Sequence, residues 1–307
     1  MPCIAICTKN RSETLLTAVS SALANDDATV VLVDQNPDGR VVDALAGLTD
    51  RRHLHHVRTN TVGAGQARNV ALANTDADIV CFTDDDCELS PDWATRLTAQ
   101  MEADPTLGLA FCPVSEAPSP QGAGYAPMHE VPQKAVFTSF SAGIRPEMLG
   151  IGAGMAVRRE AIIAIGGFDP AMGPGSIFPS ADDREVAIRL LMNGWKVADL
   201  PDLEVIHHGH RPQGPALRAL TKRDFIALGA MMAKIARSKV SGRIGHTLRF
   251  LRRMIAEVVH DSIRERRPTG FGKPLWATVG FVRGLRHPLD RAQLTYQIPQ
   301  ITMEPSP

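Results

Sequence analysis

The sequence repeats one pattern that restricts the fold: a short apolar segment of strand length ends in polar residues. Residues 3–7 lead into Thr8, residues 29–33 lead into Asp34, and residues 79–82 lead toward Asp84. Helical periodicity over residues 13–24 separates the first two segments. Because a right-handed crossover aligns successive strands in parallel, their polar ends would meet at one edge of a sheet. The pattern therefore predicts an α/β fold with a binding site at that edge.

Three adjacent carboxylates, Asp84, Asp85 and Asp86, follow the third of these apolar segments. Such a triplet repels itself unless solvent or a cation offsets the charge. In an extended segment Asp84 and Asp86 would point to one face and Asp85 to the other. Two carboxylates on one face suit a hard divalent cation that also holds phosphate oxygens. A solvated acidic turn is the competing interpretation of the triplet alone.

Two further segments carry polar groups suited to an anionic substrate. Residues 63–65, with two glycines, precede a helical segment that contains Arg68, although their spacing fits neither the dinucleotide nor the Walker phosphate loop. Asp182 and Asp183 stand at the start of a predicted helix, where the helix dipole keeps carboxylates ionised. A surface salt bridge for Arg68, and ordinary first-turn acids at 182–183, are the structural alternatives.

Composition narrows the functional class. The chain has 307 residues, 44% of them hydrophobic, and a formal net charge of zero, which argues against dedicated nucleic-acid binding. The 5 cysteines form no CxxC pair and predict reduced structural thiols. The first residues do not read as a signal peptide, and no uncharged apolar run is long enough to span a bilayer. These features predict a cytoplasmic protein.

The sequence changes character after about residue 213, and we expect a basic, amphipathic, helical region over residues 214–307. Apolar residues such as Ile244, Leu248, Leu251 and Ile255 recur at helical spacing among many arginines. A basic amphipathic helix with a tryptophan such as Trp276 can lie on the inner face of an anionic membrane as a peripheral contact. Alternatively, the apolar stripe packs on the first domain or on a second subunit in a homodimer.

Residues 1–213 resemble family 2 glycosyltransferases, which have the GT-A fold: a mixed, mostly parallel sheet with helices on both faces. The C-terminal region would form a helical appendage to this catalytic domain. Each matching segment is weak alone, but the segments stand in the family's order. They are residues 4–11, 31–34, 65–69, 82–86, 166–169 and 182–185, followed by His207.

The resemblance implies a nucleotide-sugar donor and a divalent metal cofactor, Mn²⁺ or Mg²⁺. Asp34 can accept a base N–H, which favours a pyrimidine and so a UDP- or dTDP-type donor. The implied metal ligands are Asp86, Asp84 and His207, with His208 and His210 as alternatives to His207. The implied nucleotide-binding residues are Thr8, Asn10, Arg11, Asp34, Arg68, Asp84 and Asp85.

The resemblance also implies catalysis by Asp182 and Asp183 through a single displacement with inversion. The family's Glu-Asp pair reads Asp-Asp here, and the second carboxylate, Asp183, is the expected base that takes a proton from an acceptor hydroxyl. The acceptor is expected to be a glycan or a lipid-linked glycan, selected in part by a loop over residues 115–132. A sugar nucleotidyltransferase is disfavoured because residues 7–11 lack its glycine-rich loop. A non-catalytic nucleotide-sugar binder is the third alternative.

Overall fold

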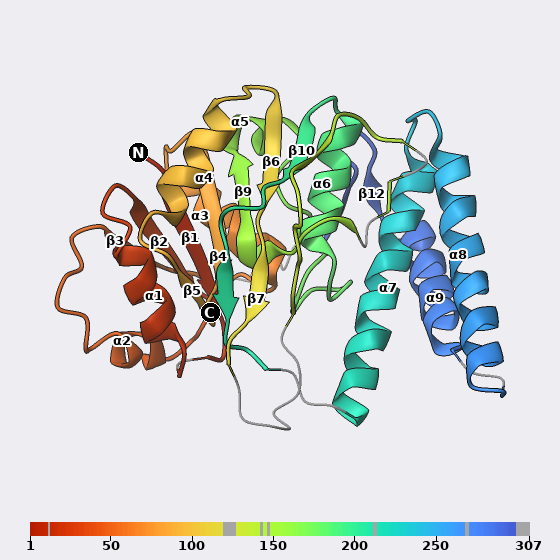
Figure 1. Ribbon diagram of the computed structural model, residues 1–307, viewed down its shortest axis with the longest axis horizontal. Coiled ribbons are helices and arrows are strands. Elements are labelled where there is room, and N and C mark those ends of the chain that lie inside the picture. The colour runs from red at the N-terminus through yellow and green to blue at the C-terminus, as the bar shows by residue number, and fades with distance from the viewer. Residues whose placement is uncertain are drawn as a thin grey trace, which may run out of the picture.

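The computed structural model describes residues 1–11, 13–118, 127–141, 144–145, 148–210, 214–267 and 270–298. Its centre is an eight-stranded mixed sheet in the order β3-β2-β1-β4-β9-β6-β10-β8 (Figure 1). The expected α/β fold with a mostly parallel sheet is confirmed. The strands of this sheet are β1 (Cys3–Thr8), β2 (Thr29–Asp34), β3 (Leu54–Arg58), β4 (Ile79–Asp84), β6 (Leu107–Phe111), β8 (Ala135–Phe137), β9 (Met155–Arg158) and β10 (Lys196–Asp199).

Strand register brings the polar strand ends together at one edge. β1 is parallel to β2 and to β4, and it pairs Thr8 with Asp34 and Cys7 with Asp84. The common edge expected from the strand-end pattern is therefore present. β9 runs antiparallel between β4 and β6, and β8 is antiparallel to β10. The sequence pattern does not indicate a strand over residues 155–158, because this short apolar run directly follows a glycine-rich segment and no turn residues separate the two.

A second, three-stranded sheet closes the same edge, in the order β5 (Cys87–Leu89), β11 (Val205–His207) and β7 (Val114–Glu116). Antiparallel pairing of β5 with β11 places Cys87 opposite His207. Parallel pairing of β11 with β7 places His207 beside Glu116. β7 includes the first two residues of the segment predicted as a loop over 115–132, and residues 119–126 lie outside the described residues. This small sheet carries the histidine toward the acidic triplet.

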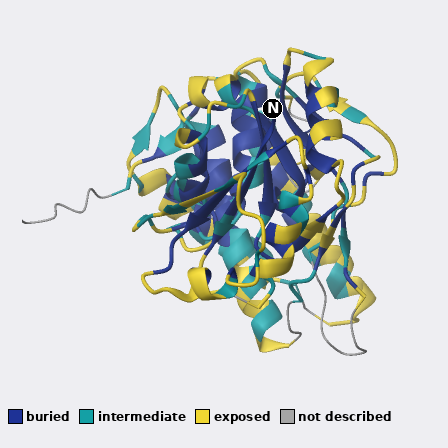
Figure 2. Ribbon diagram, turned by 90° about the vertical axis from the view of Figure 1, so that its left-hand side faces the viewer, coloured by how far each residue is buried: buried dark blue, intermediate teal, exposed yellow. Residues whose placement is uncertain are grey.

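Helices cover both faces of the central sheet, because its strands are apolar on alternate sides. Ile4 and Ile6 of β1 pack with the helices of one face, and Cys3 and Ala5 pack with those of the other. The strands form the buried centre and the helices present their outer surfaces to solvent (Figure 2). The helices of the first face are α1 (Leu15–Leu23), α2 (Arg40–Ala44) and α4 (Trp93–Glu102); those of the second are α3 (Ala64–Ala73), α5 (Arg159–Ala164) and α6 (Asp182–Met192).

The C-terminal region packs α7 against α6 and leaves its other helices outermost. It comprises α7 (Pro215–Arg237), α8 (Arg243–Arg264), α9 (Gly272–Arg286) and a short hairpin, β12 (Leu289–Asp290) with β13 (Thr295–Tyr296). Ile226, Ala230 and Met231 of α7 belong to the same buried cluster as Phe82 of β4. α7 is therefore part of the main core. Over the described ranges, no helix combines the length and the apolar character that crossing a bilayer takes.

A buried ionic cluster joins this region to α6. Lys234 of α7 is 3% exposed and donates to Asp169 Oδ2 and to Glu185 Oε1, each at 2.5 Å. Arg189 donates to both Glu185 oxygens at 2.6 and 3.0 Å. The backbone N–H of Tyr296 donates to Asp169 Oδ2 at 2.7 Å. Burial raises the pKa of Glu185, but the charges of Arg189 and Lys234 outweigh burial and hold it below its usual value.

All 5 cysteines are free thiols, as the odd number and spacing predicted. Four of them are buried in the apolar core, at Cys3, Cys81, Cys87 and Cys112. Burial raises the pKa of the Cys112 thiol to about 12, which leaves it protonated and unreactive near neutral pH.

Candidate active site

The acidic triplet begins where β4 ends. β4 stops at Asp84, and Asp85 and Asp86 form a turn before β5. The alternation of an extended chain therefore does not continue through the triplet, because the chain must turn to enter the second sheet. The Asp84 side chain is 43% exposed, whereas Asp85 and Asp86 are buried. Asp84 is thus the carboxylate of the three that faces outward from the edge.

Asp85 ties the loop after β1 to the end of β4. Thr8 Oγ1 donates to Asp85 Oδ2 at 2.7 Å, Arg11 Nη1 donates to Asp85 Oδ1 at 3.2 Å, and Thr14 Oγ1 donates to the Asp85 carbonyl at 3.0 Å. Burial raises the pKa of Asp85, opposed by the Thr8 hydroxyl and the Arg11 charge. Both carboxylate oxygens are therefore engaged by the chain itself, so Asp85 orders Thr8 and Arg11 at the edge.

Asp86 lies among side chains of the kinds that ligate cations. Both of its carboxylate oxygens are buried and lack a hydrogen-bond partner among the described residues. The Arg11 guanidinium forms an ion pair with Oδ2, and His207 Nε2 lies 3.6 Å from Oδ1. Ligand atoms of Asp86, Cys87 and His207 lie within 4.8 Å of one another. A buried carboxylate beside an imidazole offers ligand atoms that suit a divalent cation, and Arg11 neutralises the oxygen that lies farther from His207.

The three histidines at and just after the end of β11 differ in their surroundings. His207 lies beside Asp86, whereas His208 pairs with Glu88 at 3.1 Å and His210 pairs with Glu116 at 3.1 Å. The Gly209 N–H donates to His207 Nδ1 at 3.0 Å and so orients the ring. A side chain at position 209 would collide with the Asp86 carboxylate. Geometry therefore favours His207 over the other two as a partner of Asp86.

Arg68 connects the triplet to the second acidic cluster. Its guanidinium is buried, forms an ion pair with Asp182 and lies 3.9 Å from Asp84 Oδ1. The aromatic rings of Phe82 and Phe168 lie 6.0 and 5.6 Å from the guanidinium carbon. Asp84 and Asp182 thus approach the two terminal nitrogens of one guanidinium. The two acidic clusters, far apart in the sequence, converge at the same edge of the sheet.

Asp182 and Asp183 occupy the first turn of α6. Ala181, which precedes them, is buried and adopts a left-handed backbone with φ of 64°, a strained conformation for a residue with a side chain. Asp183 Oδ2 accepts from the Gly152 N–H at 3.0 Å, and Oδ1 accepts from the Arg184 N–H at 2.7 Å. Asp183 is half-buried and ends beside the segment before β9. This arrangement fixes the direction of a partly accessible carboxylate.

Asp34 lies at the same edge but is enclosed by its own neighbours. It is 1% exposed; Oδ1 accepts from the Asn36 N–H and side-chain amide at 2.8 and 2.9 Å, and Oδ2 lies 3.0 Å from His56 Nε2. Asn36 in turn accepts from the N–H of Asn10, which has a left-handed φ of 61°. Asp34 therefore shapes the loop that carries Asn10, and contact with a base requires movement of Asn36 or His56.

Several residues that the sequence analysis missed support this site. Gly152 approaches both Asp183 and Arg68, and a side chain there would collide with the Arg68 guanidinium. His56 meets Asp34 because β3 pairs with β2 in parallel register. The glycine-rich run over 150–154 was a visible signal for a close backbone approach. His56 had no local signal, because its role depends on the register of two strands.

A family comparison matches residues 3–166 to the model described as "Glycosyl transferase family 2". The chain belongs to glycosyl transferase family 2. The match covers more than half of the chain and includes β1, β2, the Arg68 helix and the acidic triplet. The chain is therefore a glycosyltransferase, as its motif order implied. No curated protein matches the sequence.

Solved structures of glycosyltransferases share this fold. A mannosyltransferase from Pyrobaculum calidifontis, solved in complex with GDP-Man and Mn²⁺, aligns with a TM-score of 0.61 at 18% identity, covering 93% of this chain and 87% of its own. TarS from S. aureus, residues 1–349, aligns with a TM-score of 0.64 at 12% identity, covering 93% and 81%. The same TarS fragment in complex with UDP-GlcNAc gives a TM-score of 0.64 at 14% identity, covering 92% and 81%. These alignments support the GT-A architecture.

Proposed function

We propose that this family 2 glycosyltransferase moves a sugar from a nucleoside-diphosphate sugar to an acceptor hydroxyl, with inversion and with a divalent metal cofactor. The observation that carries the proposal is the Asp84–Arg68–Asp182 bridge, which unites the two acidic clusters at one edge. The acidic triplet suits a cation that also binds a diphosphate. The Asp182–Asp183 pair offers a carboxylate that can accept the proton of a hydroxyl. The structural relatives with GDP-Man and UDP-GlcNAc support a nucleotide-sugar donor.

The nucleotide end of the donor fits the loops after β1 and β2. Asn10 and Arg11 follow β1 at the same edge as Asp34, and Arg11 reaches both Asp85 and Asp86. Arg11 is half exposed, so its guanidinium can turn to a ribose or phosphate oxygen. A UDP- or dTDP-type donor is proposed because a carboxylate or amide at Asp34 or Asn36 can pair with a pyrimidine N–H. Because one structural relative was solved with GDP-Man and another with UDP-GlcNAc, the base of the donor has to be determined by experiment.

The side chains around Asp86 fit a divalent cation. Asp86 and His207 would hold the ion, and the outward carboxylate of Asp84 would lie on its donor side. The set offers hard carboxylate oxygen and imidazole nitrogen, which suits Mn²⁺ and Mg²⁺. Cys87 is the third member of the group, but its soft sulfur suits Mn²⁺ and Mg²⁺ less well than oxygen and nitrogen ligands do. A cation bound here would offset the negative charge of the leaving diphosphate.

Asp183 is the proposed general base. One of its oxygens accepts the proton of the acceptor hydroxyl, the hydroxyl oxygen forms a bond to the anomeric carbon, and the bond from that carbon to the diphosphate oxygen breaks. Electrons of that bond leave with the nucleoside diphosphate. The Gly152 N–H holds Asp183 Oδ2 in place. The positive charge of Arg68, which pairs with the neighbouring Asp182, would favour the diphosphate.

The acceptor is proposed to be a hydroxyl of a glycan or of a lipid-linked glycan. The part of the chain proposed to select it includes residues 127–132, at the end of the predicted loop over 115–132. His129 bonds to the backbone of Val114 and to Asp199 at 3.2 Å, which anchors the segment beside β7 and β10. The choice of acceptor would therefore depend on the residues that follow His129 in the chain.

Release of nucleoside diphosphate from a panel of UDP-, dTDP- and GDP-sugars, with and without acceptor glycans, tests the proposal. The variant Asp183→Asn should fold and still bind donor but lose turnover about 10²–10⁴-fold. Asp76→Asn is the matched control, because Asp76 is exposed and precedes β4 at the opposite edge of the sheet. Full turnover by a folded Asp183→Asn protein would show that another group is the base.

A further inference from the structure

One face of the C-terminal region carries a continuous row of exposed apolar side chains. α8 packs inward through His246, Phe250 and Met254, which are buried. On the side of the same helix that faces away from these residues, a second row points to solvent. Its members are 48–73% exposed: Ile244, Leu248, Leu251, Ile255, Val259 and Ile263. Six exposed aliphatic side chains in one line are more than the scattered apolar residues of an ordinary surface.

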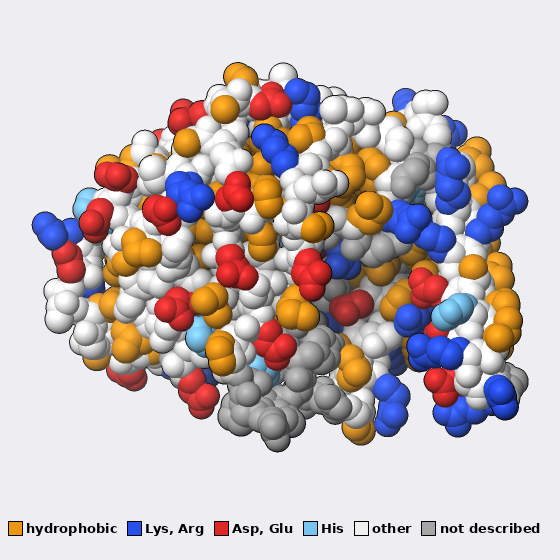
Figure 3. All heavy atoms as spheres, in the orientation of Figure 1, with side chains coloured by type: hydrophobic (Ala, Val, Ile, Leu, Met, Phe, Trp, Pro, Cys, Tyr) orange, Lys and Arg blue, Asp and Glu red, His pale blue; other side chains and the backbone are white. Residues whose placement is uncertain are grey.

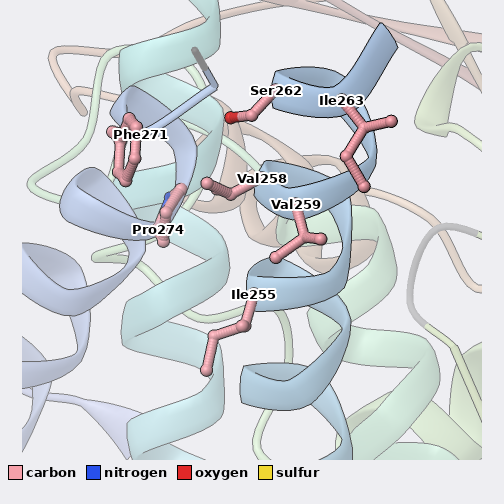
Figure 4. A pocket seen from close by; sticks show the side chains of 7 residues that line it. All are labelled: Ile255, Val258, Val259, Ser262, Ile263, Phe271 and Pro274. Atoms are coloured by element: carbon pink, nitrogen blue, oxygen red, sulfur yellow. The ribbon is translucent and has the colours of Figure 1, made fainter. Parts of the chain in front are cut away.

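α9 extends this apolar row into a broader surface. Phe271 and Leu275 at the start of α9 are 58% and 57% exposed. They lie next to a groove between the helices that has a volume of about 450 Å³ and is lined by Ile255, Val259, Ile263 and Phe271 among others. Figure 4 shows these side chains turned toward the groove from both helices. We call the α8 row, this groove and the exposed apolar residues of α9 the α8–α9 face.

Basic side chains border the α8–α9 face. Arg249, Arg252 and Arg264 of α8, and Arg267 just after it, are exposed. Residues 243–286 contain ten Lys and Arg but three Asp and Glu, so the border has a strong positive excess. Figure 3 shows hydrophobic side chains along the outer edge of α8 with Lys and Arg around them. The face combines apolar area with an excess of positive charge.

The groove within the α8–α9 face lies toward the same end of the molecule as the candidate active site. In Figure 1, α8 ends and α9 begins in the lower part of the view, and β7 runs toward that same end. β11 is parallel to β7 and has His207 at its carboxyl end. The groove formed by the end of α8 and the start of α9 therefore lies toward the edge that carries the acidic clusters.

We propose that the α8–α9 face docks on the surface of an anionic lipid bilayer. An amphipathic helix of this kind lies in the interface with its apolar side among the acyl chains and its basic side at the headgroups. Anionic headgroups complement the arginine border, and each basic residue near such a surface adds to the attraction. In a symmetric dimer through the same face, the border of one copy would meet that of the other, with repulsion between like charges. The charge pattern therefore favours a bilayer over a second copy.

Co-sedimentation of the full chain with vesicles tests this proposal without an enzyme assay, so its failure is separate from that of the proposed function. Vesicles of phosphatidylcholine are compared with an equimolar mixture of phosphatidylcholine and phosphatidylglycerol. We expect binding to the mixture at low salt, little binding to phosphatidylcholine alone, and weakening as salt rises. Absence of binding to the anionic vesicles at low salt overturns the proposal.

Two sets of variants assign the binding to this face. The triple variant Leu248→Ser, Leu251→Ser, Ile255→Ser should lose binding at least about tenfold. The control Val42→Ser, Val136→Ser, Ile163→Ser removes residues of similar exposure elsewhere and should bind as the parent does. Arg249→Gln with Arg252→Gln should also weaken binding about tenfold or more, whereas Arg52→Gln with Arg96→Gln should not.

The same variants report on the dimer alternative through light scattering. A protein that is dimeric in solution, becomes monomeric with the triple serine change and does not bind vesicles would overturn the bilayer proposal in favour of a dimer interface. Equal vesicle binding by the triple serine variant and its control would also overturn it, because the apolar row would then be unnecessary.

Discussion

Arg68 of α3 forms a buried ion pair with Asp182 at the first position of α6. The same guanidinium lies 3.9 Å from Asp84, so one side chain holds together two acidic segments from distant parts of the chain. A buried charge without its partner costs several kcal/mol. The pair is therefore important both for the stability of the fold and for the alignment of the candidate site.

Replacement of Arg68 should separate these two contributions. Arg68→Met leaves Asp182 buried and unpaired, and we expect it to lower the free energy of unfolding by about 3–5 kcal/mol and to abolish most turnover. The double variant Arg68→Met, Asp182→Asn removes both charges and should recover much of the stability. Urea unfolding and nucleotide release are the measurements. Recovery of turnover along with stability in the double variant would show that Arg68 has no role beyond the pair.

Removal of the proposed metal should show whether Asp86 and His207 act as its ligands. Treatment with a chelator should abolish turnover, and added Mn²⁺ or Mg²⁺ should restore it. His207→Ala and Asp86→Asn should each lower turnover at saturating metal by at least about 100-fold. His208→Ala is the matched control, because its ring pairs with the exposed Glu88. Equal losses in the two histidine variants would argue against His207 as the ligand.

The close approach of Gly209 to Asp86 gives a test that leaves every polar group in place. A side chain at 209 would collide with the Asp86 carboxylate, so Gly209→Ala should shift that group and lower turnover about 10²-fold. Gly39→Ala is the control, since a side chain there meets no atom within 4 Å. Metal titration of both variants by calorimetry should show weaker binding for Gly209→Ala. If Gly209→Ala bound the metal with unchanged affinity, metal binding would not depend on the position of Asp86.

The Lys234 cluster predicts a pH dependence of stability. The folded pKa of Glu185 is lowered, so its interactions stabilise the protein above its unfolded value near 4.5 and lose that effect as the pH falls through the folded value. In Lys234→Met a large part of the compensating charge is gone, and burial shifts the pKa of Glu185 upward. We expect this variant to be less stable by about 3–5 kcal/mol at pH 7. Because protonation of Glu185 relieves the unpaired charge, the difference from the parent protein should shrink as the pH falls.

Urea unfolding of both proteins at several pH values between 7 and 4 measures this difference directly. Lys239→Met is the control for loss of a single lysine charge, because Lys239 follows α7 and has no part in the buried cluster. A difference between Lys234→Met and the parent that is independent of pH would contradict the role of Glu185.

Local sequence patterns predicted which residues lie at the edge of the sheet, but they did not predict the contacts between side chains of different helices. Thr8, Asp34 and Asp84 each end a short apolar run, and parallel pairing alone brings such ends together. The Arg68–Asp182 pair could not be foreseen, because it depends on how α3 and α6 pack on the same face. Lys234 lies within the region predicted to be basic and amphipathic, yet it is buried against Asp169 and Glu185. Such contacts follow from tertiary packing and leave no periodic signal.

A crystal soaked with a nucleoside diphosphate and Mn²⁺ tests most directly whether one pocket contains both acidic clusters. We expect the metal between Asp86 and His207, the diphosphate within reach of Arg68, and Asp183 facing the space where the sugar would lie. Nucleotide bound away from this edge, or Asp183 turned away from the diphosphate on the far side of α6, would contradict the account.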